Sequence, residues 1–287
     1  MRTIRIGVLA LGVLSSGAAA CKDNKMAHAQ TSATALRSDL QRAREAAQRA
    51  VDGFVPKVRE LVGPVTAPVT NNDPVALRST LVGFTTPGGP MTLYPTSFVA
   101  VTNREGVALA RDLPNESDDR MKGMDLRAPF ACVRAALEGR EGMCVGELPA
   151  VQNVPSRVLL VAAAPIKNAA GETIGSISAG LTFGVFSRMI DTAVRGQVGG
   201  AVFWTGLRYQ DRVLPSGTDQ DVAPRWRVPA SLIRTIPPAD AMRIEQAGGE
   251  HFYPFEQDGR GWAGALGALP FLPRTVLVLF RSEASQR

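Results

Sequence analysis

Residues that could carry catalysis are scarce in this sequence of 287 residues, which contains only two histidines, His28 and His251. A serine hydrolase needs a serine on a strained turn beside a histidine base, but Ser176 and Ser178 lie in G-S-I-S-A-G, which is not G-x-S-x-G. Zinc and haem sites need paired histidines, C-x-x-C or C-x-x-C-H, and the sequence has none of these. We therefore expect no metal, no cofactor and no enzyme activity. An envelope hydrolase with a Ser–His or Cys–His pair is the weakest alternative.

A glycine motif near the end of the sequence matches G-x-G-x-x-G literally, from Gly259 to Gly264. A dinucleotide site needs this motif early in a βαβ unit, followed by an acidic residue about twenty positions later. Only 23 residues follow Gly264, and Pro270 and Pro273 exclude a long helix there. We interpret Asp258-Gly259 as the tip of a hairpin.

Two cysteines in the middle of the sequence, Cys132 and Cys144, suit a disulfide in an oxidising compartment. Cys132 lies in a predicted helix, and Cys144 lies in a strand-like run that returns along it. A bridge between them would stabilise the fold by roughly 3 kcal/mol in the chain-entropy model. Two separate buried thiols are the alternative, and the sequence leaves both open.

The first twenty residues have the pattern of an export signal. Arg2 and Arg5 precede an apolar run over 6–14, and small residues over 15–20 approach a cleavage site. The apolar run is too short to span a bilayer in the mature protein. We expect residues 1–20 to be a signal peptide.

Cys21 follows three alanines, which resembles the lipobox of bacterial lipoproteins, although Ala18 stands where leucine is commoner. Ordinary cleavage after 18–20 or 27–29 is the alternative. We expect lipidation at Cys21, a tether over 21–32, and a periplasmic or outer-membrane-associated protein held to the membrane by its lipid anchor. Lys22 after the cysteine favours the outer membrane.

Two β-hairpins flank a helix in the middle of the sequence. Apolar runs over 98–102 and 107–111 are joined by a turn with Gly106, and runs over 158–166 and 173–183 are joined by a turn with Gly171. Between them, 126–139 has proline near its start and glycine at its end, as helices do. Strand, strand, helix, strand, strand predicts an α+β fold with an antiparallel sheet and helices on one face.

A long amphipathic helix is predicted before the first hairpin. Apolar residues step by three and four over 33–61, which gives one stripe that can pack on a sheet. A dimerising coiled coil is the less favoured interpretation. A second helix follows the start signal Asp73-Pro74 and runs over 75–84. The apolar positions of the stripe are Leu36, Leu40, Ala43, Ala47, Val51, Phe54, Val58 and Leu61.

The C-terminal part, 196–287, has its own β-prone runs over 201–204, 251–255, 262–269 and 275–280, with helical material over 230–247. It is predicted to be either a second, divergent module or a set of strands that enlarges the first. We favour two modules, over 33–195 and 196–287.

Three segments resemble the Cache family, the extracellular relatives of PAS sensor domains. They are the strand, turn and strand over 99–106, the helix entry over 123–130, and the hairpin over 163–177. The resemblance implies a ligand-sensing fold with a long helix before its sheet. It also implies that the C-terminal part is a second PAS-like module, as in double-Cache proteins.

The resemblance places a ligand pocket between the sheet and the segment that enters the helix. Arg127, Phe130 and Arg157 are the residues that it selects, with arginine suited to a carboxylate or phosphate. Arg127 as a surface arginine is the alternative. Amino-acid-binding members carry an aspartate on the final strand, where this chain has Gly180. A small anion, or no ligand at all, is therefore a better expectation than an amino acid.

The formal net charge of +6 comes from scattered lysines and arginines, so a nucleic-acid partner is not expected. The favoured hypothesis is an exported sensory lipoprotein that binds a small molecule and signals through a membrane-bound partner protein. The alternative is a degenerate envelope scaffold or interaction protein that binds no ligand.

Overall fold

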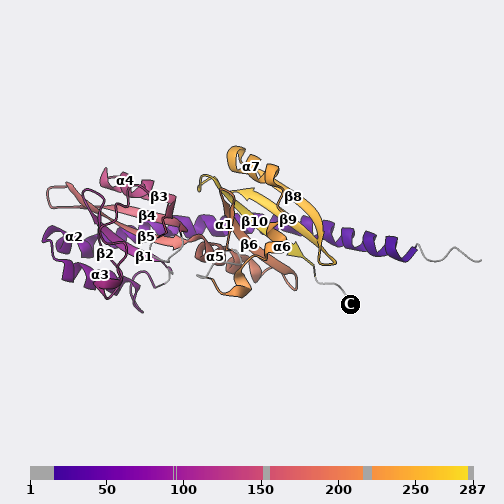
Figure 1. The fold of residues 1–287 in the computed structure, drawn as a ribbon, viewed down its shortest axis with the longest axis horizontal. Coiled ribbons are helices and arrows are strands. Elements are labelled where there is room, and N and C mark those ends of the chain that lie inside the picture. Colours follow the sequence, from indigo (N-terminus) through magenta and orange to yellow (C-terminus); the bar gives the residue numbers. More distant parts are fainter. Residues whose placement is uncertain (1–15, 93, 95, 151–155, 216–221, 284–287) are drawn as a thin grey trace, which may run out of the picture.

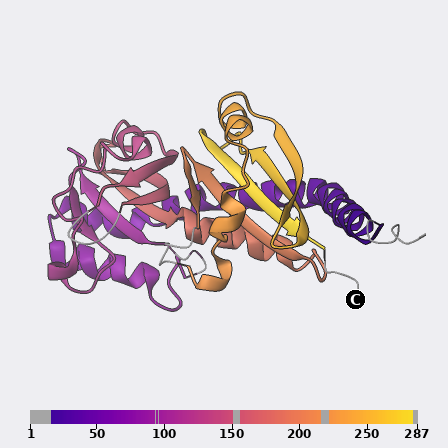
Figure 2. The ribbon, with the colours of Figure 1, turned by 45° about the vertical axis from the view of Figure 1, so that its right-hand side comes forward.

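Two antiparallel sheets lie side by side along one long helix in the computed structural model, which describes residues 16–92, 94, 96–150, 156–215 and 222–283 (Figure 1). The long helix α1 (Ser16–Glu60) runs behind both sheets, and its N-terminal part extends beyond the second one. The view turned by 45° shows the same order, with the two sheets at successive places along α1 (Figure 2). Each sheet and its helices is called a module below.

The first module contains a five-stranded sheet in the order β2-β1-β5-β4-β3, with every neighbouring pair antiparallel. Both predicted hairpins are present as β1 with β2 and as β4 with β5. The elements are α2 (Val62–Thr70), α3 (Pro74–Thr85), β1 (Phe98–Asn103), β2 (Ala108–Arg111), η1 (Glu116–Asp118), α4 (Ala131–Leu137), β3 (Gly142–Leu148), β4 (Arg157–Lys167) and β5 (Thr173–Thr182).

The second module repeats this topology, because its order β7-β6-β10-β9-β8 has the same connectivity and is antiparallel throughout. Helix α5 (Phe183–Arg195) connects the two modules directly from the end of β5. The remaining elements are β6 (Val202–Tyr209), β7 (Arg212–Leu214), η2 (Pro224–Trp226), α6 (Ala230–Ile233), α7 (Pro238–Ala247), β8 (Glu250–Gln257), β9 (Arg260–Ala268) and β10 (Thr275–Ser282).

Three cores follow from the alternation of side chains along the strands. On β1, Val99 and Val101 join the large core that α1 and α5 share with both sheets, whereas Phe98 and Ala100 face a separate core under α4. On β10, Leu277 and Leu279 join the large core, while alternate residues face a third core under α6 and α7. Each sheet is therefore buried on both faces, with α1 behind it and short helices in front.

Helix α1 begins earlier than the sequence pattern predicts, since it starts at Ser16 and includes the expected tether over 21–32. Alanine is frequent in this stretch and has the highest helix propensity. The predicted apolar stripe is buried against the sheets. A buried ion pair also fixes the helix to β10, since Arg281 donates to Asp39 at 2.7 Å and the Asp39 side chain is fully buried.

Local signals read from the sequence recur in the structure. Asp73 caps α3 by accepting hydrogen bonds from the backbone N–H groups of Val75 and Ala76. Asp258 and Gly259 form the two-residue turn between β8 and β9, and both have positive φ, as a type I′ turn requires. The glycine motif is thus part of a hairpin. Among the helices of the described ranges, none has the length and apolar character needed to cross a bilayer.

Candidate ligand site of the first module

A cavity of about 290 Å³ opens at one end of the first sheet, on the face that carries α4. It lies where β2 and β3 end and where β1 and β4 begin, so residues from four strands meet there. Its charged lining has three arginines, Arg111, Arg120 and Arg157, against one aspartate, Asp118. The rest of the lining, mostly apolar, is Ser97, Phe98, Leu113, Met121, Met124, Leu148, Pro149 and Leu159.

Strand register explains why two of these arginines face the cavity. Arg111 stands opposite Ala100 in the β1–β2 pair, and Ala100 faces the core under α4. Arg157 is two residues before Leu159 on β4, and Leu159 faces the same core. Side chains opposite each other, or two apart on one strand, share a face of the sheet. Both arginines therefore project from the edge of an apolar face.

Arg111 has donor capacity that the described part of the protein leaves unused. Its Nη2 donates to the carbonyl oxygen of Ser97 at 3.0 Å, while its Nε is buried and has no hydrogen-bond partner among the described residues. The nearest carboxylate oxygen, Oδ1 of Asp112, lies 3.6 Å from Nε and accepts a hydrogen bond from the backbone N–H of Val99. A buried donor without an acceptor costs free energy, so Nε is suited to an acceptor supplied by a ligand.

The arrangement combines positive charge with an apolar floor. Arginine donors form short, charge-assisted hydrogen bonds to carboxylates and phosphates. The apolar lining suits a short carbon chain rather than a fully hydrated ion. A small organic acid meets both requirements, with its acid group at Arg111 and Arg157 and its carbon atoms over Phe98 and Leu159.

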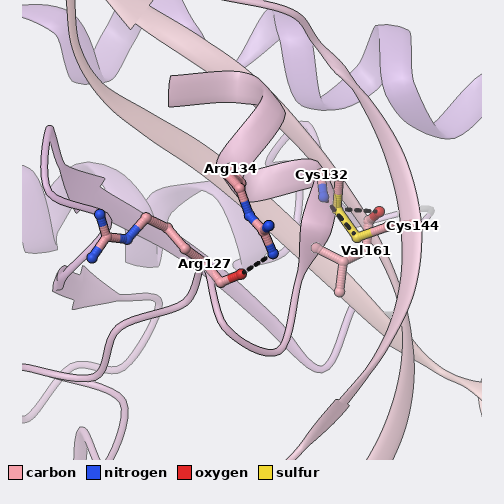
Figure 3. The surroundings of a disulfide bond; sticks show 5 residues. All are labelled: Arg127, Cys132, Arg134, Cys144 and Val161. Atoms are coloured by element: carbon pink, nitrogen blue, oxygen red, sulfur yellow. Dashed lines mark hydrogen bonds between the residues drawn. A yellow bond between two sulfur atoms is a disulfide. The ribbon is translucent and has the colours of Figure 1, made fainter. Parts of the chain in front are cut away.

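Arg127 lies outside this cavity lining. Its guanidinium donates to both carboxylate oxygens of Asp125, at 3.0 and 2.8 Å, and the side chain is 44% exposed. This pairing lowers the pKa of Asp125 to about 2. Figure 3 shows the Arg127 side chain pointing away from Arg134, whose guanidinium donates to the Arg127 carbonyl oxygen at 3.3 Å. The contacts of Arg127 are those of a surface residue.

Phe130 is fully buried and supports the cavity from below. Its ring lies 6.2 Å from that of Phe98, which lines the cavity. The ring of Phe98 occupies the space in front of Gly180, where an added Cβ would lie 2.3 Å from Phe98 Cε1. An acidic side chain at position 180 is therefore excluded by Phe98. Of the three residues selected from the sequence, Arg157 lines the cavity and Phe130 contacts its floor.

The structure joins Cys132 on α4 and Cys144 on β3 in a disulfide, with Cα atoms 5.3 Å apart (Figure 3). β3 is one of the two edge strands of the sheet, and α4 is a helix of seven residues. The Cys132 sulfur lies 3.3 Å from the carbonyl oxygen of Val161 on β4, so the bridge packs directly on the sheet. The disulfide therefore holds the short helix to the sheet edge beside the core that contains Phe98 and Phe130.

The corresponding face of the second module is packed with aromatic rings. Phe255 on β8 stacks on Trp262 of β9 at 6.4 Å and meets Phe280 of β10 edge-on at 6.2 Å. The arginine on this face, Arg208, is 12% exposed and donates to Glu245 of α7 at 2.5 Å. Arg208 thus has its hydrogen-bond acceptor within the module, whereas Nε of Arg111 has no hydrogen-bond partner among the described residues.

No family model matches the sequence, and no curated protein matches it. Solved structures do share its fold. The sensor domain of the histidine kinase DctB from V. cholerae matches with a TM-score of 0.54 at 13% identity, covering 89% of this chain and 99% of that one. The ligand-binding domain of the chemoreceptor PctB from Pseudomonas aeruginosa PAO1, in complex with L-Arg, matches with a TM-score of 0.50 at 16% identity, covering 88% and 94%.

The sensory domain of the chemoreceptor Tlp3 from Campylobacter jejuni, with isoleucine bound, matches with a TM-score of 0.50 at 11% identity, covering 94% of this chain and 98% of that one. These matches extend over both modules and the long helix. At such identities they show the fold alone: this chain shares the fold of these sensor and ligand-binding domains, which is the α+β fold with a long helix expected from the sequence.

Sequence reasoning missed Arg111 and Arg120, the other two arginines of the cavity. A signal for Arg111 is present in the sequence, because Arg111 ends the strand-like run over 107–111 and is followed directly by Asp112. A charged residue at the end of a buried strand is a common way to place a functional group at a sheet edge. Arg120 follows the short η1 turn, and nothing in the sequence indicates that this turn meets the sheet.

Proposed function

We propose that this chain is an extracytoplasmic sensory protein that binds a small organic acid in the first module and signals through a partner protein. The observation that carries the proposal is the buried Nε of Arg111, which has no acceptor among the described residues and belongs to a cavity side chain. Its fold is shared with sensor and ligand-binding domains, which supports a sensory role by analogy.

A partner is part of the proposal because ligand binding must bias some output. The two modules account for the described chain from Phe98 onward, and both have the same strand order. Occupancy can shift a conformational equilibrium only if the ligand prefers one state. A membrane-bound signalling protein that contacts one state of the modules would read that difference.

Membrane attachment through Cys21 remains a proposal of its own. Residues 1–15 lie outside the described residues, and Cys21 lies within the backbone of α1. Labelled palmitate should be incorporated by the wild-type protein in cells and not by Cys21→Ser. Equal labelling of both proteins would contradict lipidation at this residue.

Binding can be tested by thermal unfolding of the purified protein with millimolar acetate, lactate, succinate or malate. A ligand present at 100 times its Kd stabilises by about 2.7 kcal/mol, so a binding acid should raise Tm by several degrees. Succinamide is the matched neutral control and should have no effect. If no acid raises Tm, the acid-binding proposal fails and the scaffold alternative is favoured.

A catalytic alternative has less support from the described residues. Cys132 and Cys144 are bonded to each other, so neither is a free thiolate nucleophile. His251 lies 3.4 Å from Asp240 and stacks on Tyr253, both in the second module. These contacts indicate that His251 has a structural role in the second module.

A further inference from the structure

One arginine outside the cavity is connected to its wall. Arg78 on α3 is 13% exposed, and its Nη1 donates to the carbonyl oxygen of Leu113 at 3.2 Å. The same Nη1 lies 3.9 Å from Oδ2 of Asp119, and Nη2 lies 4.0 Å from Oε2 of Glu116. Arg78 thus reaches from an outer helix to three points on the segment 113–119.

Asp119 is the centre of this segment. Its side chain is fully buried, and its carboxylate accepts hydrogen bonds from the backbone N–H groups of Arg111 at 3.1 Å, Met121 at 3.1 Å and Lys122 at 3.2 Å. One carboxylate therefore ties the end of β2 to the turn that follows η1. Arg111 and Met121 both line the cavity.

A buried carboxylate is stable only when its charge is balanced and its oxygens are hydrogen-bonded. The three backbone N–H groups satisfy the oxygens of Asp119, and Arg78 supplies the cation nearest to them among the described ion pairs. Glu116 and Lys122, which face the same cluster, contact each other and add no net charge. Removing Arg78 would leave one uncompensated negative charge beneath the cavity wall.

We propose that Arg78 is a positioning residue for the acid site: it holds Asp119 in place, and Asp119 holds Arg111 and Met121 at the cavity. The expected effect on acid affinity rests on the proposed function. The contacts from Arg78 through Asp119 to Arg111 exist within the protein without a ligand. Arg78 does not line the 290 Å³ cavity. Its effect on a bound acid is therefore indirect and acts through the backbone of the 111–122 segment.

The test compares Arg78→Ala, Arg78→Lys and Asp119→Asn with the wild-type full chain. Arg243→Ala is the matched control, because Arg243 pairs with Asp240 on the surface of α7, in the other module. The first measurement is hydrogen exchange of the Arg111, Met121 and Lys122 amides. We expect exchange at least tenfold faster in Arg78→Ala and Asp119→Asn, partly restored in Arg78→Lys, and unchanged in the control and in β10 amides.

The second measurement is the affinity for sodium succinate, or for whichever acid of the panel binds most tightly. We expect Arg78→Ala to weaken binding at least tenfold, and Arg78→Lys to recover part of it. Unchanged exchange over 111–122 in Arg78→Ala, or equal loss in Arg243→Ala, would overturn the positioning role. If Arg78→Ala does not fold, Arg78→Lys and Asp119→Asn decide by the same exchange criterion.

The two proposals can fail separately. If the wild type binds no acid, the proposed function fails, and the exchange data alone decide whether Arg78 positions the cavity wall. If the wild type binds an acid, but Arg78→Ala and Asp119→Asn change neither the amide exchange nor the acid affinity, the positioning role fails and the acid site stands.

Discussion

The two modules share one strand order and one supporting helix, yet they use the same face of the sheet differently. In the first module this face ends in a cavity bordered by Arg111, Arg120 and Arg157. In the second module, the described residues on this face include stacked rings, among them Phe255 and Trp262. The shared topology therefore does not make a site by itself, and the side chains on this face decide whether it carries a cavity or a packed core.

The hydrogen bonding of one arginine in each module separates the modules in the same way. Arg208 of the second module is paired with Glu245, and the pair is shielded from solvent. Arg111 of the first module keeps a buried Nε without an acceptor in the described chain. An arginine whose partner is built into the fold has a structural role, whereas one with an unused buried donor is prepared for a ligand. Under the proposed function, the first module binds the ligand and the second module stabilises the fold.

The largest effect should come from deleting a buried ring in either module. Phe280→Ala and Phe130→Ala each remove a fully buried phenylalanine and should lower the free energy of unfolding by about 3–5 kcal/mol, measured by urea denaturation. Only Phe130→Ala should also weaken acid binding, because Phe130 supports Phe98 under the cavity. Equal losses of affinity in both variants would contradict the division of roles.

The disulfide should contribute the next largest effect, and in the first module alone. Cys132→Ala/Cys144→Ala opens a loop with a sequence separation of 12 and should lower the free energy of unfolding by about 3 kcal/mol. Hydrogen exchange should rise over α4 and β3 and stay unchanged over β8 to β10. Faster exchange throughout the second module would show that the modules do not respond separately.

A matched pair of arginines tests the charge comparison. Arg111→Ala should weaken acid binding by roughly 10–100-fold, which corresponds to the loss of roughly 1.5–3 kcal/mol from a charge-assisted hydrogen bond. It should also lower Tm, because it removes the cation beside Asp112 and the hydrogen bond to Ser97. Arg208→Ala should lower Tm and leave the acid affinity unchanged, because it leaves the largely buried Glu245 without its cation. Calorimetric titration measures the acid affinity of both variants, and thermal unfolding measures their Tm. Loss of acid binding in Arg208→Ala with an unchanged Tm would contradict the structural role given to Arg208 and would place the acid site in the second module.

The smallest effect is expected from the exposed pair Asp125–Arg127. The pKa of Asp125 is lowered to about 2 by Arg127, below the value of about 3.9 for an unfolded chain. The contribution of the pair is therefore fully present above pH 4 and lost as the pH falls through 2. A carboxyl NMR titration should show this midpoint in the wild type and a higher one in Arg127→Ala.

Acid affinity should be the same in Arg127→Ala and in the wild type, because Arg127 does not line the cavity. A tenfold loss of affinity in this variant would restore Arg127 to the site and show that the cavity is larger than its described lining.

The sequence predicts the architecture well, because it depends on local patterns. Gly106 and Gly171 mark the hairpin turns, and both have positive φ in the structure. The apolar stripe of α1 is buried as its spacing predicts. Burial alternates strictly only where one face of a strand is open, and β4 and β5 are buried on both faces. The continuous apolar runs of β4 and β5 therefore predict two strands, but they do not show which face of the sheet carries the site.

The site is less predictable because it is assembled from distant parts of the chain. Arg157 was selected as the start of a strand, and Arg127 as an arginine near a helix entry. A shift of a few ångströms decides whether an arginine side chain enters a cavity or binds a nearby carboxylate. Arg127 donates its hydrogen bonds to Asp125, two residues before it. The role of Arg111 depends on Ala100 opposite it and on Asp119 eight residues later, which only the folded chain brings together.

The most direct measurement is the NMR signal of the Arg111 Nε–H group, assigned with Arg111→Lys and followed during titration with an acid that raises Tm. The account predicts a saturable shift of this signal with the same Kd as calorimetry, at one site per chain, while the Arg208 signal stays in place. Saturable binding that leaves the Arg111 signal unmoved, or moves that of Arg208 instead, would contradict it.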